Sequence, residues 1–131
     1  MALTAAIATL TTALATQGAA LAAQGVALTA AIAAQGVALT VVIMIEGARS
    51  FNSSAILEHH TLRSVPNAAG LMPALAAPVV WYPASREIFN GGGLTNARAD
   101  ALLQFYALPP MAGNLQTKRA AIGAHIGVRP N

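Results

Sequence analysis

The stretch 2–48 reads ALTAAIATLTT (2–12), ALATQGA (13–19), ALAAQGV (20–26), ALTAAIAAQGV (27–37) and ALTVVIMIEGA (38–48), and each segment begins with Ala-Leu. The segments are 11, 7, 7, 11 and 11 residues long. Repeats of seven and eleven residues return a helical stripe to the same side after two and three turns. No side chain before Glu46 is charged. The repeat therefore predicts one long helix, and we expect residues 1–46 to form an uncharged helical rod.

One face of this helix collects the larger apolar side chains and three glutamines at spacings of three or four, as a buried helical stripe requires. A glycine inside a helix costs about 1 kcal/mol against alanine, and an exposed stripe of this length would aggregate. Because the flanking positions are Ala, Thr or Gly instead of Glu and Lys, we expect a parallel, homotrimeric, coiled-coil-like bundle in which the glutamines fix the register. The predicted oligomerisation seam consists of Leu3, Ile7, Leu10, Leu14, Gln17, Leu21, Gln24, Leu28, Ile32, Gln35, Leu39 and Ile43.

An alternative interpretation of the same stretch is a membrane span. The segment Val26–Ile45 holds twenty residues with Gln35 as its strongly polar interruption, and Arg49 follows it. That length suits a bilayer. Against a span, Ala, Thr and Gly favour membrane insertion only weakly. A signal peptide is disfavoured because no Lys or Arg precedes Arg49.

The composition narrows the function classes. Charged residues make up 8% of the 131-residue chain, against about 25% in typical soluble domains. We therefore expect that the chain either lies in a membrane or has much of its surface covered by partners. The formal net charge of +3 comes from scattered residues. No basic run is interleaved with aromatic side chains, which argues against nucleic-acid binding. The chain has no cysteine, so disulfides and thiolate chemistry are excluded.

After the rod, residues 47–92 are expected to form an extended linker rich in proline and glycine. Prolines at 66, 73, 78 and 83 forbid regular helix and central strand over much of it. The best strand candidate is 79–82, and its Trp81 and Tyr82 are predicted partner contacts.

Residues 93–131 are predicted to form a small, helix-turn-helix-like α+β domain. The first helix begins with a cap at Thr95 or Asn96 and runs to about Ala107. The second runs from a cap at Thr117 to His125 and closes at Gly127. Short strands are expected at 111–115 and 128–131. The predicted fold class is mainly α with this small α+β part.

No catalytic constellation is visible, and we expect neither an enzyme nor a cofactor. His59 and His60 beside Glu58 form the one concentration of ionisable groups. Adjacent histidines point to different sides of a helix or strand, so one chain alone would not bind a metal through both. In a trimer, one of them could meet its copies on the axis, but hydrogen-bonding roles are favoured. The glycines at 91–93 lack the Lys-Ser/Thr of a P-loop.

The C-terminal stretch contains five short motifs: Leu94-Thr95, ADALL (99–103), Gly113-Asn114-Leu115, KRAAI (118–122) and Gly127-Val128. This pattern resembles the terminal cap of bacterial and phage leucine-rich-repeat proteins, although no such repeats precede it. The rod of Ala, Thr and Gln-Gly repeats resembles the shafts of bacteriophage tail fibres and head appendages, which are commonly trimeric.

Together these resemblances imply a virion structural protein, such as a tail fibre, head appendage or neck subunit, assembled in the host cytoplasm. Its expected partners are its own copies, other virion proteins and a host-surface receptor, which the C-terminal part would contact in host attachment.

Overall fold

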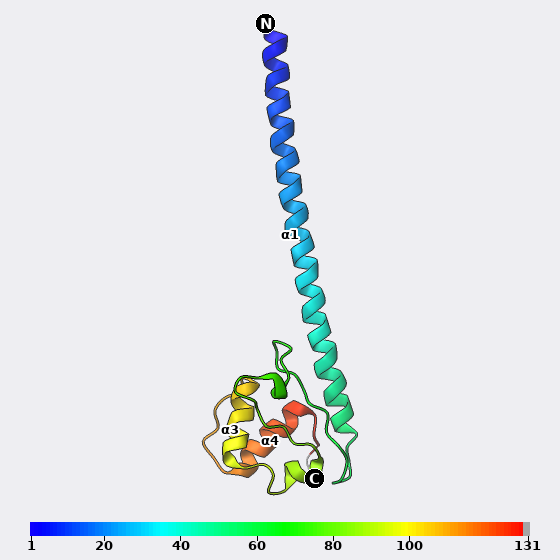
Figure 1. Cartoon of the computed structure of the whole chain (residues 1–131), viewed down its shortest axis with the longest axis vertical. Coiled ribbons are helices and arrows are strands. Elements are labelled where there is room, and N and C mark those ends of the chain that lie inside the picture. The colour runs from blue at the N-terminus through cyan, green and yellow to red at the C-terminus, as the bar shows by residue number, and fades with distance from the viewer. Residues whose placement is uncertain (130–131) are drawn as a thin grey trace. The chain divides into compact units, whose positions relative to one another are not determined.

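The computed structural model describes residues 1–129 and is mainly helical, with a long N-terminal helix and almost no strand (Figure 1). This confirms the predicted mainly α class and the predicted long helix. The one β-pairing among residues 1–129 is an isolated antiparallel bridge between Thr61 and Ser85. The elements in order are α1 (Ala2–Ser53), the 3₁₀ turn η1 (Pro73–Leu75), α2 (Arg86–Asn90), α3 (Asn96–Phe105) and α4 (Leu115–Ile126).

The chain divides into two compact units, Met1–Leu39 and Thr40–Asn131. The division at residues 46 and 92 stays a prediction. The first unit consists of α1 alone. Within the second unit α1 continues beyond residue 46 to Ser53, although we expected the extended linker to begin at residue 47. The reason is tertiary: Ala48 and Asn52 of this last part are buried against the rest of the second unit.

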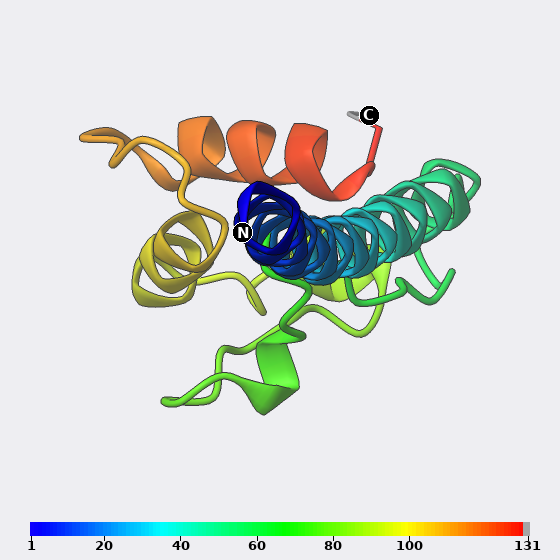
Figure 2. The same ribbon diagram turned by 90° about the horizontal axis from the view of Figure 1, so that it is seen from above.

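The second unit has one apolar core. Its most deeply buried large apolar side chains come from the loop before η1, from the turn before α3 and from the two C-terminal helices. Figure 2, in which α4 (orange to red) is seen from the side and α3 (yellow) nearly end-on, shows that these helices cross at a steep angle. The fully buried apolar side chains of the core include Val65, Leu94, Leu102, Ile122 and Ile126.

The segment that we predicted as an extended linker is largely without regular secondary structure, but it contributes to this core. Val65 is fully buried and Phe89 of α2 almost so. Residues 79–82 do not form the expected strand, because no other strand lies beside them to pair with. The four prolines at 66, 73, 78 and 83 therefore predicted correctly that the chain between them forms no α-helix. They carry no information on which of its side chains are buried.

The C-terminal helices begin and end at local signals. The Thr95 side chain accepts a hydrogen bond from the backbone N–H of Arg98 at 3.3 Å, as predicted. The second helix begins at Leu115, earlier than expected, because Asn114 caps it by accepting from the Thr117 N–H at 2.9 Å. Gly127 ends it in the left-handed conformation, with φ 87°.

The strand expected at 111–115 is therefore absent; its last residue begins α4. The short strand expected at 128–131 is not formed at Val128 or Arg129. Its last two residues, Pro130 and Asn131, lie outside the described part of the chain.

Candidate functional site

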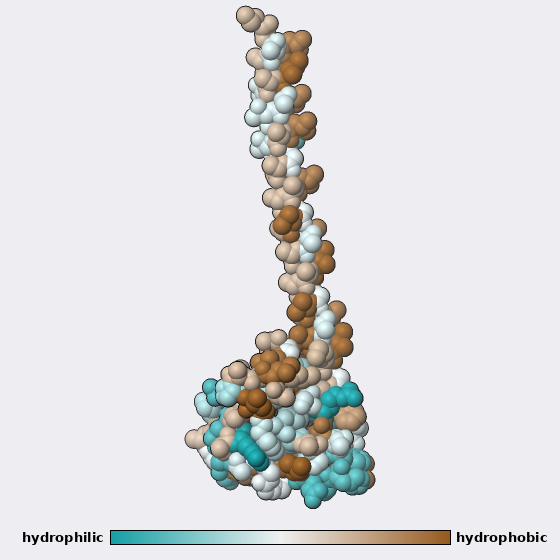
Figure 3. Space-filling view, in the orientation of Figure 1, coloured by the Kyte–Doolittle hydropathy of each residue, from teal (hydrophilic) through white to brown (hydrophobic). Residues whose placement is uncertain are grey.

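The predicted seam residues lie along one side of α1. At about 100° per residue, all twelve positions fall within an arc of about 100° on a straight α-helix. Their apolar members are exposed in the single chain, for example Leu10 at 70% and Leu21 at 70%. In the first unit, the space-filling view shows most of the brown hydrophobic side chains along one edge of the helix, with a few on the opposite edge (Figure 3). An uncovered apolar stripe of this kind is typical of an interaction surface.

Three glycines of the rod lie next to the seam. An ideal Cβ added at any of them would meet nothing within 4 Å, so the single chain does not require glycine there. Glycine nevertheless weakens a helix by about 1 kcal/mol relative to alanine. Close approach of another surface would explain its repeated use at Gly18, Gly25 and Gly36.

The threonines of the rod satisfy their own hydroxyl groups. Five of them donate to the backbone carbonyl four residues earlier, at 2.8 Å from Thr11 to Ile7 and 3.0 Å from Thr16 to Thr12. The same bond is made by Thr9, Thr12 and Thr29. Burial of these hydroxyl groups under a partner helix or a lipid chain therefore costs little free energy, because their hydrogen bonds are already made within the helix.

Within the second unit, α1 has two opposite faces. Ala48 and Asn52 are buried, and Val41 and Ile45 are half-buried against the same unit. Ile43, the last seam residue, is 63% exposed. By helical phase the inward stripe points about 170° away from Ile43. Within the second unit, the segments that follow α1 therefore pack on the side of α1 opposite Ile43.

Asn52 is the central polar group of the inward face. It is fully buried, its Nδ2 donates to the carbonyls of Arg63 at 3.0 Å and Ile126 at 2.9 Å, and its Oδ1 accepts from the Arg63 N–H at 2.7 Å. Sequence reasoning missed this residue. The signal that could have found it is a second stripe at spacings of four, three and four: Val41, Ile45, Ala48 and Asn52.

The predicted partner contacts are engaged inside the second unit. The Tyr82 hydroxyl donates to the Arg63 carbonyl at 2.9 Å and accepts from Asn52 Nδ2 at 3.2 Å. Burial raises the pKa of Tyr82 well above its usual range, although the Asn52 hydrogen bond acts in the opposite direction. The guanidinium of Arg98 lies 4.6 Å over the Trp81 ring, a favourable cation–π arrangement. Trp81 and Tyr82 are both half-buried, so part of each side chain stays open to a partner.

The histidines do not form a metal site in the chain. Their rings at positions 59 and 60 lie edge to face, with centroids 5.1 Å apart. His60 Nδ1 accepts from the Leu57 N–H at 3.4 Å. Within residues 1–129, no group of three or more His, Asp or Glu side chains is placed to hold a metal ion. His125 lies against Tyr106, with ring centroids 4.6 Å apart, and burial lowers its pKa, helped by the positive charge of Arg49.

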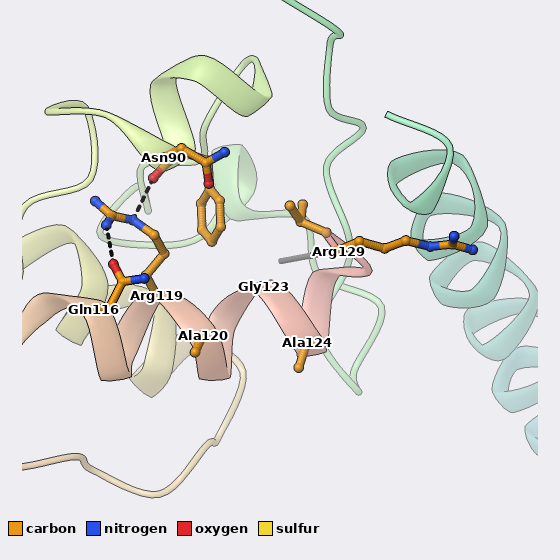
Figure 4. A pocket seen from close by; sticks show the side chains of 9 residues that line it. Asn90, Gln116, Arg119, Ala120, Gly123, Ala124 and Arg129 are labelled. Atoms are coloured by element: carbon orange, nitrogen blue, oxygen red, sulfur yellow. Dashed lines mark hydrogen bonds between the residues drawn. The ribbon is translucent and has the colours of Figure 1, made fainter. Parts of the chain in front are cut away.

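A groove of about 400 Å³ lies between α4 and the end of α2 (Figure 4). Phe89 and the small residues of α4 form its apolar part. At one end, Arg119 donates to the Phe89 carbonyl at 3.0 Å and to Gln116 Oε1 at 2.8 Å, so its guanidinium is held mainly by the protein itself. The lining residues are Phe89, Asn90, Gln116, Arg119, Ala120, Gly123, Ala124, Val128 and Arg129. Nothing in the sequence analysis had singled out this groove.

Comparison of the chain with protein-family models, curated proteins and solved structures found no match. By length and composition, α1 is the one helix in residues 1–129 able to cross a membrane. The exposed seam of α1 is the candidate site, because its apolar side chains lie on one side of the helix and are uncovered in the single chain.

Proposed function

We propose that this chain is a structural subunit that assembles with copies of itself through the seam of α1, as a parallel and trimeric bundle. The observation that carries the proposal is the pair of opposite faces on α1. The domain covers the inward stripe, while the seam residue Ile43 and those before it stay exposed. Burial of an apolar side chain such as leucine contributes about 1.5–3 kcal/mol. A bundle would bury such side chains at nearly every turn of the rod.

The larger context belongs to the same proposal. A low-charge rod that carries a small domain suits a virion component such as a phage tail fibre, head appendage or neck subunit. Its role would be architectural and without catalysis, and it would act in the virion after assembly in the host cytoplasm. The second unit would contact other virion proteins or a host receptor, with Trp81 as the first side chain to test. The resemblances to fibre shafts and repeat caps support this context.

Light scattering on the full chain without detergent, at two concentrations, tests the assembly. A mass of three times 13.2 kDa that does not change with concentration is the expected result. A matched pair of variants locates the surface: Leu28→Asp places a charge on the seam, and Ala30→Asp places the same charge on the opposite side. We expect only Leu28→Asp to dissociate the bundle. Equal masses for both variants would contradict the proposed seam.

A second candidate is a small membrane protein with a span near Val26–Ile45. The supporting observation is that α1 is long and apolar enough, with none of its most apolar window buried within the chain. Both positions lie near the start of this span, so a membrane would penalise Leu28→Asp and Ala30→Asp alike, by less than the roughly 2.5–3.5 kcal/mol that such a charge costs at the bilayer centre. Substitution of leucine at Gln17, Gln24 and Gln35 adds a second discriminator. A span should insert better after this change, whereas a bundle should change its oligomeric state.

A further inference from the structure

Resting on the proposed assembly, we infer that Glu46 and Arg49 form a charged layer between copies of the chain that fixes their orientation and register. These are the first two charged side chains in the sequence, and no other charge lies on α1. Arg49 Nη1 lies 3.1 Å from Glu46 Oε1. Both side chains are solvent-accessible, Glu46 at 64% and Arg49 at 37%.

The helical phase places this pair at the seam. Glu46 follows Ile43 by three positions and so continues the apolar stripe, while Arg49 lies about 60° to one side of Glu46. In a bundle, Glu46 would be turned toward the axis and Arg49 toward the neighbouring helix. Several carboxylates near one axis repel each other unless cations lie beside them. Arg49 can supply that cation both to its own Glu46 and to that of the next chain.

The repeats alone specify the register weakly. A slip of seven residues brings Gln17 beside Gln24, and a slip of eleven brings Gln24 beside Gln35. Of the six seam leucines, three meet another leucine after a slip of seven, and four meet a leucine or isoleucine after a slip of eleven. The pair Glu46 and Arg49 occurs once, so it meets its own copies only when the chains are parallel and unshifted. In an antiparallel pairing, these charges would lie beside the uncharged N-terminal part of the neighbour.

Arg49 also links this layer to the second unit. Its Nη2 donates to the Ala124 carbonyl of α4 at 3.4 Å. Ala48, which lies about 160° around the helix from Glu46, is buried in the same unit. The charged layer therefore lies where α1 meets its own domain, and the domain stays on the outer side of each helix. A fixed register would place the second unit of every copy at the same position along the axis of the bundle.

A cysteine reporter tests the inference, since the chain has no cysteine of its own. Leu14→Cys places a thiol on the seam about 48 Å from Glu46 along the helix, too far for a local effect of the charges. A slip of seven residues moves the two thiol-bearing Cα atoms apart by about 10 Å. Disulfides need Cα atoms within about 7 Å. Disulfide formation by the full-length chain therefore reports parallel, unshifted pairing.

We expect Glu46→Arg and Arg49→Glu, each combined with Leu14→Cys, to slow disulfide formation about tenfold. The exchanged double variant, Glu46→Arg with Arg49→Glu, should restore the rate because opposite charges meet again. Glu87→Lys is the matched control, since it reverses an exposed charge on α2 and should leave the rate unchanged. Trp81 fluorescence checks that the second unit of each variant is folded.

The outcomes separate the inference from the proposed assembly. Equal rates in all variants, with an unchanged mass by light scattering, would overturn the charged layer and leave the bundle intact. Slow rates in both single variants without recovery in the exchanged variant would also overturn it. A monomeric parent chain would overturn the proposed assembly itself, and the charged layer with it.

Discussion

Replacement of Asn52 by alanine is the sharpest test of how the domain is held on α1. This side chain connects three segments that lie far apart in the sequence: α1, the loop at Arg63 and the end of α4 at Ile126. It has no exposed surface in the chain. Alanine removes both its amide group and its carbonyl oxygen, and it leaves a small space that the neighbouring backbone cannot fill.

The expected loss follows from the groups that would be left behind. The Arg63 N–H and the Ile126 carbonyl would lose the Asn52 side chain as partner, whereas the Arg63 carbonyl keeps the Tyr82 hydroxyl at 2.9 Å. A buried polar group without its partner costs about 1–3 kcal/mol. Two such groups predict that Asn52→Ala lowers the free energy of unfolding of the second unit by about 3 kcal/mol.

Urea unfolding followed by Trp81 fluorescence measures this quantity, because the chain has one tryptophan and it lies in the second unit. With a slope of about 1–3 kcal/mol per molar urea, the midpoint should fall by about 1 M or more. Asn90→Ala is the control: its amide lies 3.2 Å from the exposed Glu58 carboxylate, and we expect a change of about 0.5 kcal/mol or less. A loss below about 1 kcal/mol for Asn52→Ala would refute the reasoning.

Three further predictions concern the glycines and a histidine. Gly127→Ala should destabilise the second unit by about 2 kcal/mol or more in urea unfolding, because φ is 87° and the new Cβ would collide with the Arg49 backbone. Gly92→Ala is the control and should be near neutral, because a Cβ added there would meet no atom within 4 Å. Burial lowers the pKa of His125 in the folded chain, so as the pH falls the unfolded chain binds this proton before the folded chain does. The free energy of unfolding should therefore fall as the pH drops below about 6.5. In urea midpoints measured from pH 8 to 5, His125→Gln should remove this dependence on pH. If the helix stays alone, alanine at the three rod glycines should stabilise it by about 3 kcal/mol. If a neighbouring helix packs against the glycines, the added methyl groups should instead lower the melting temperature of the assembly, measured by circular dichroism. A higher melting temperature would show that no chain packs against Gly18, Gly25 and Gly36.

Local patterns in the sequence account for much of the secondary structure. The 7- and 11-residue repeat predicts a single long helix, and the structure has one, because every repeat places its leucines on the same side of the axis. The Thr95 cap and the left-handed Gly127 were also predicted, since each depends on hydrogen bonds or backbone conformation within a few residues. The seam was found by the same local spacing, and its role in assembly stays a prediction.

Contacts between distant segments decided the rest. The helix continues to Ser53 because Asn52 donates hydrogen bonds to the carbonyls of Arg63 and Ile126. The sequence around Arg49 contains no local signal from which these contacts could be predicted. Residues 54–92 have no apolar period from which burial could be predicted, yet Val65 and Phe89 enter the core. Their prolines exclude regular structure but leave open which side chains are covered. The sequence by itself therefore determined the long helix and its apolar stripe, and only the tertiary structure decided which face of that helix the domain covers, because burial depends on where the other segments lie.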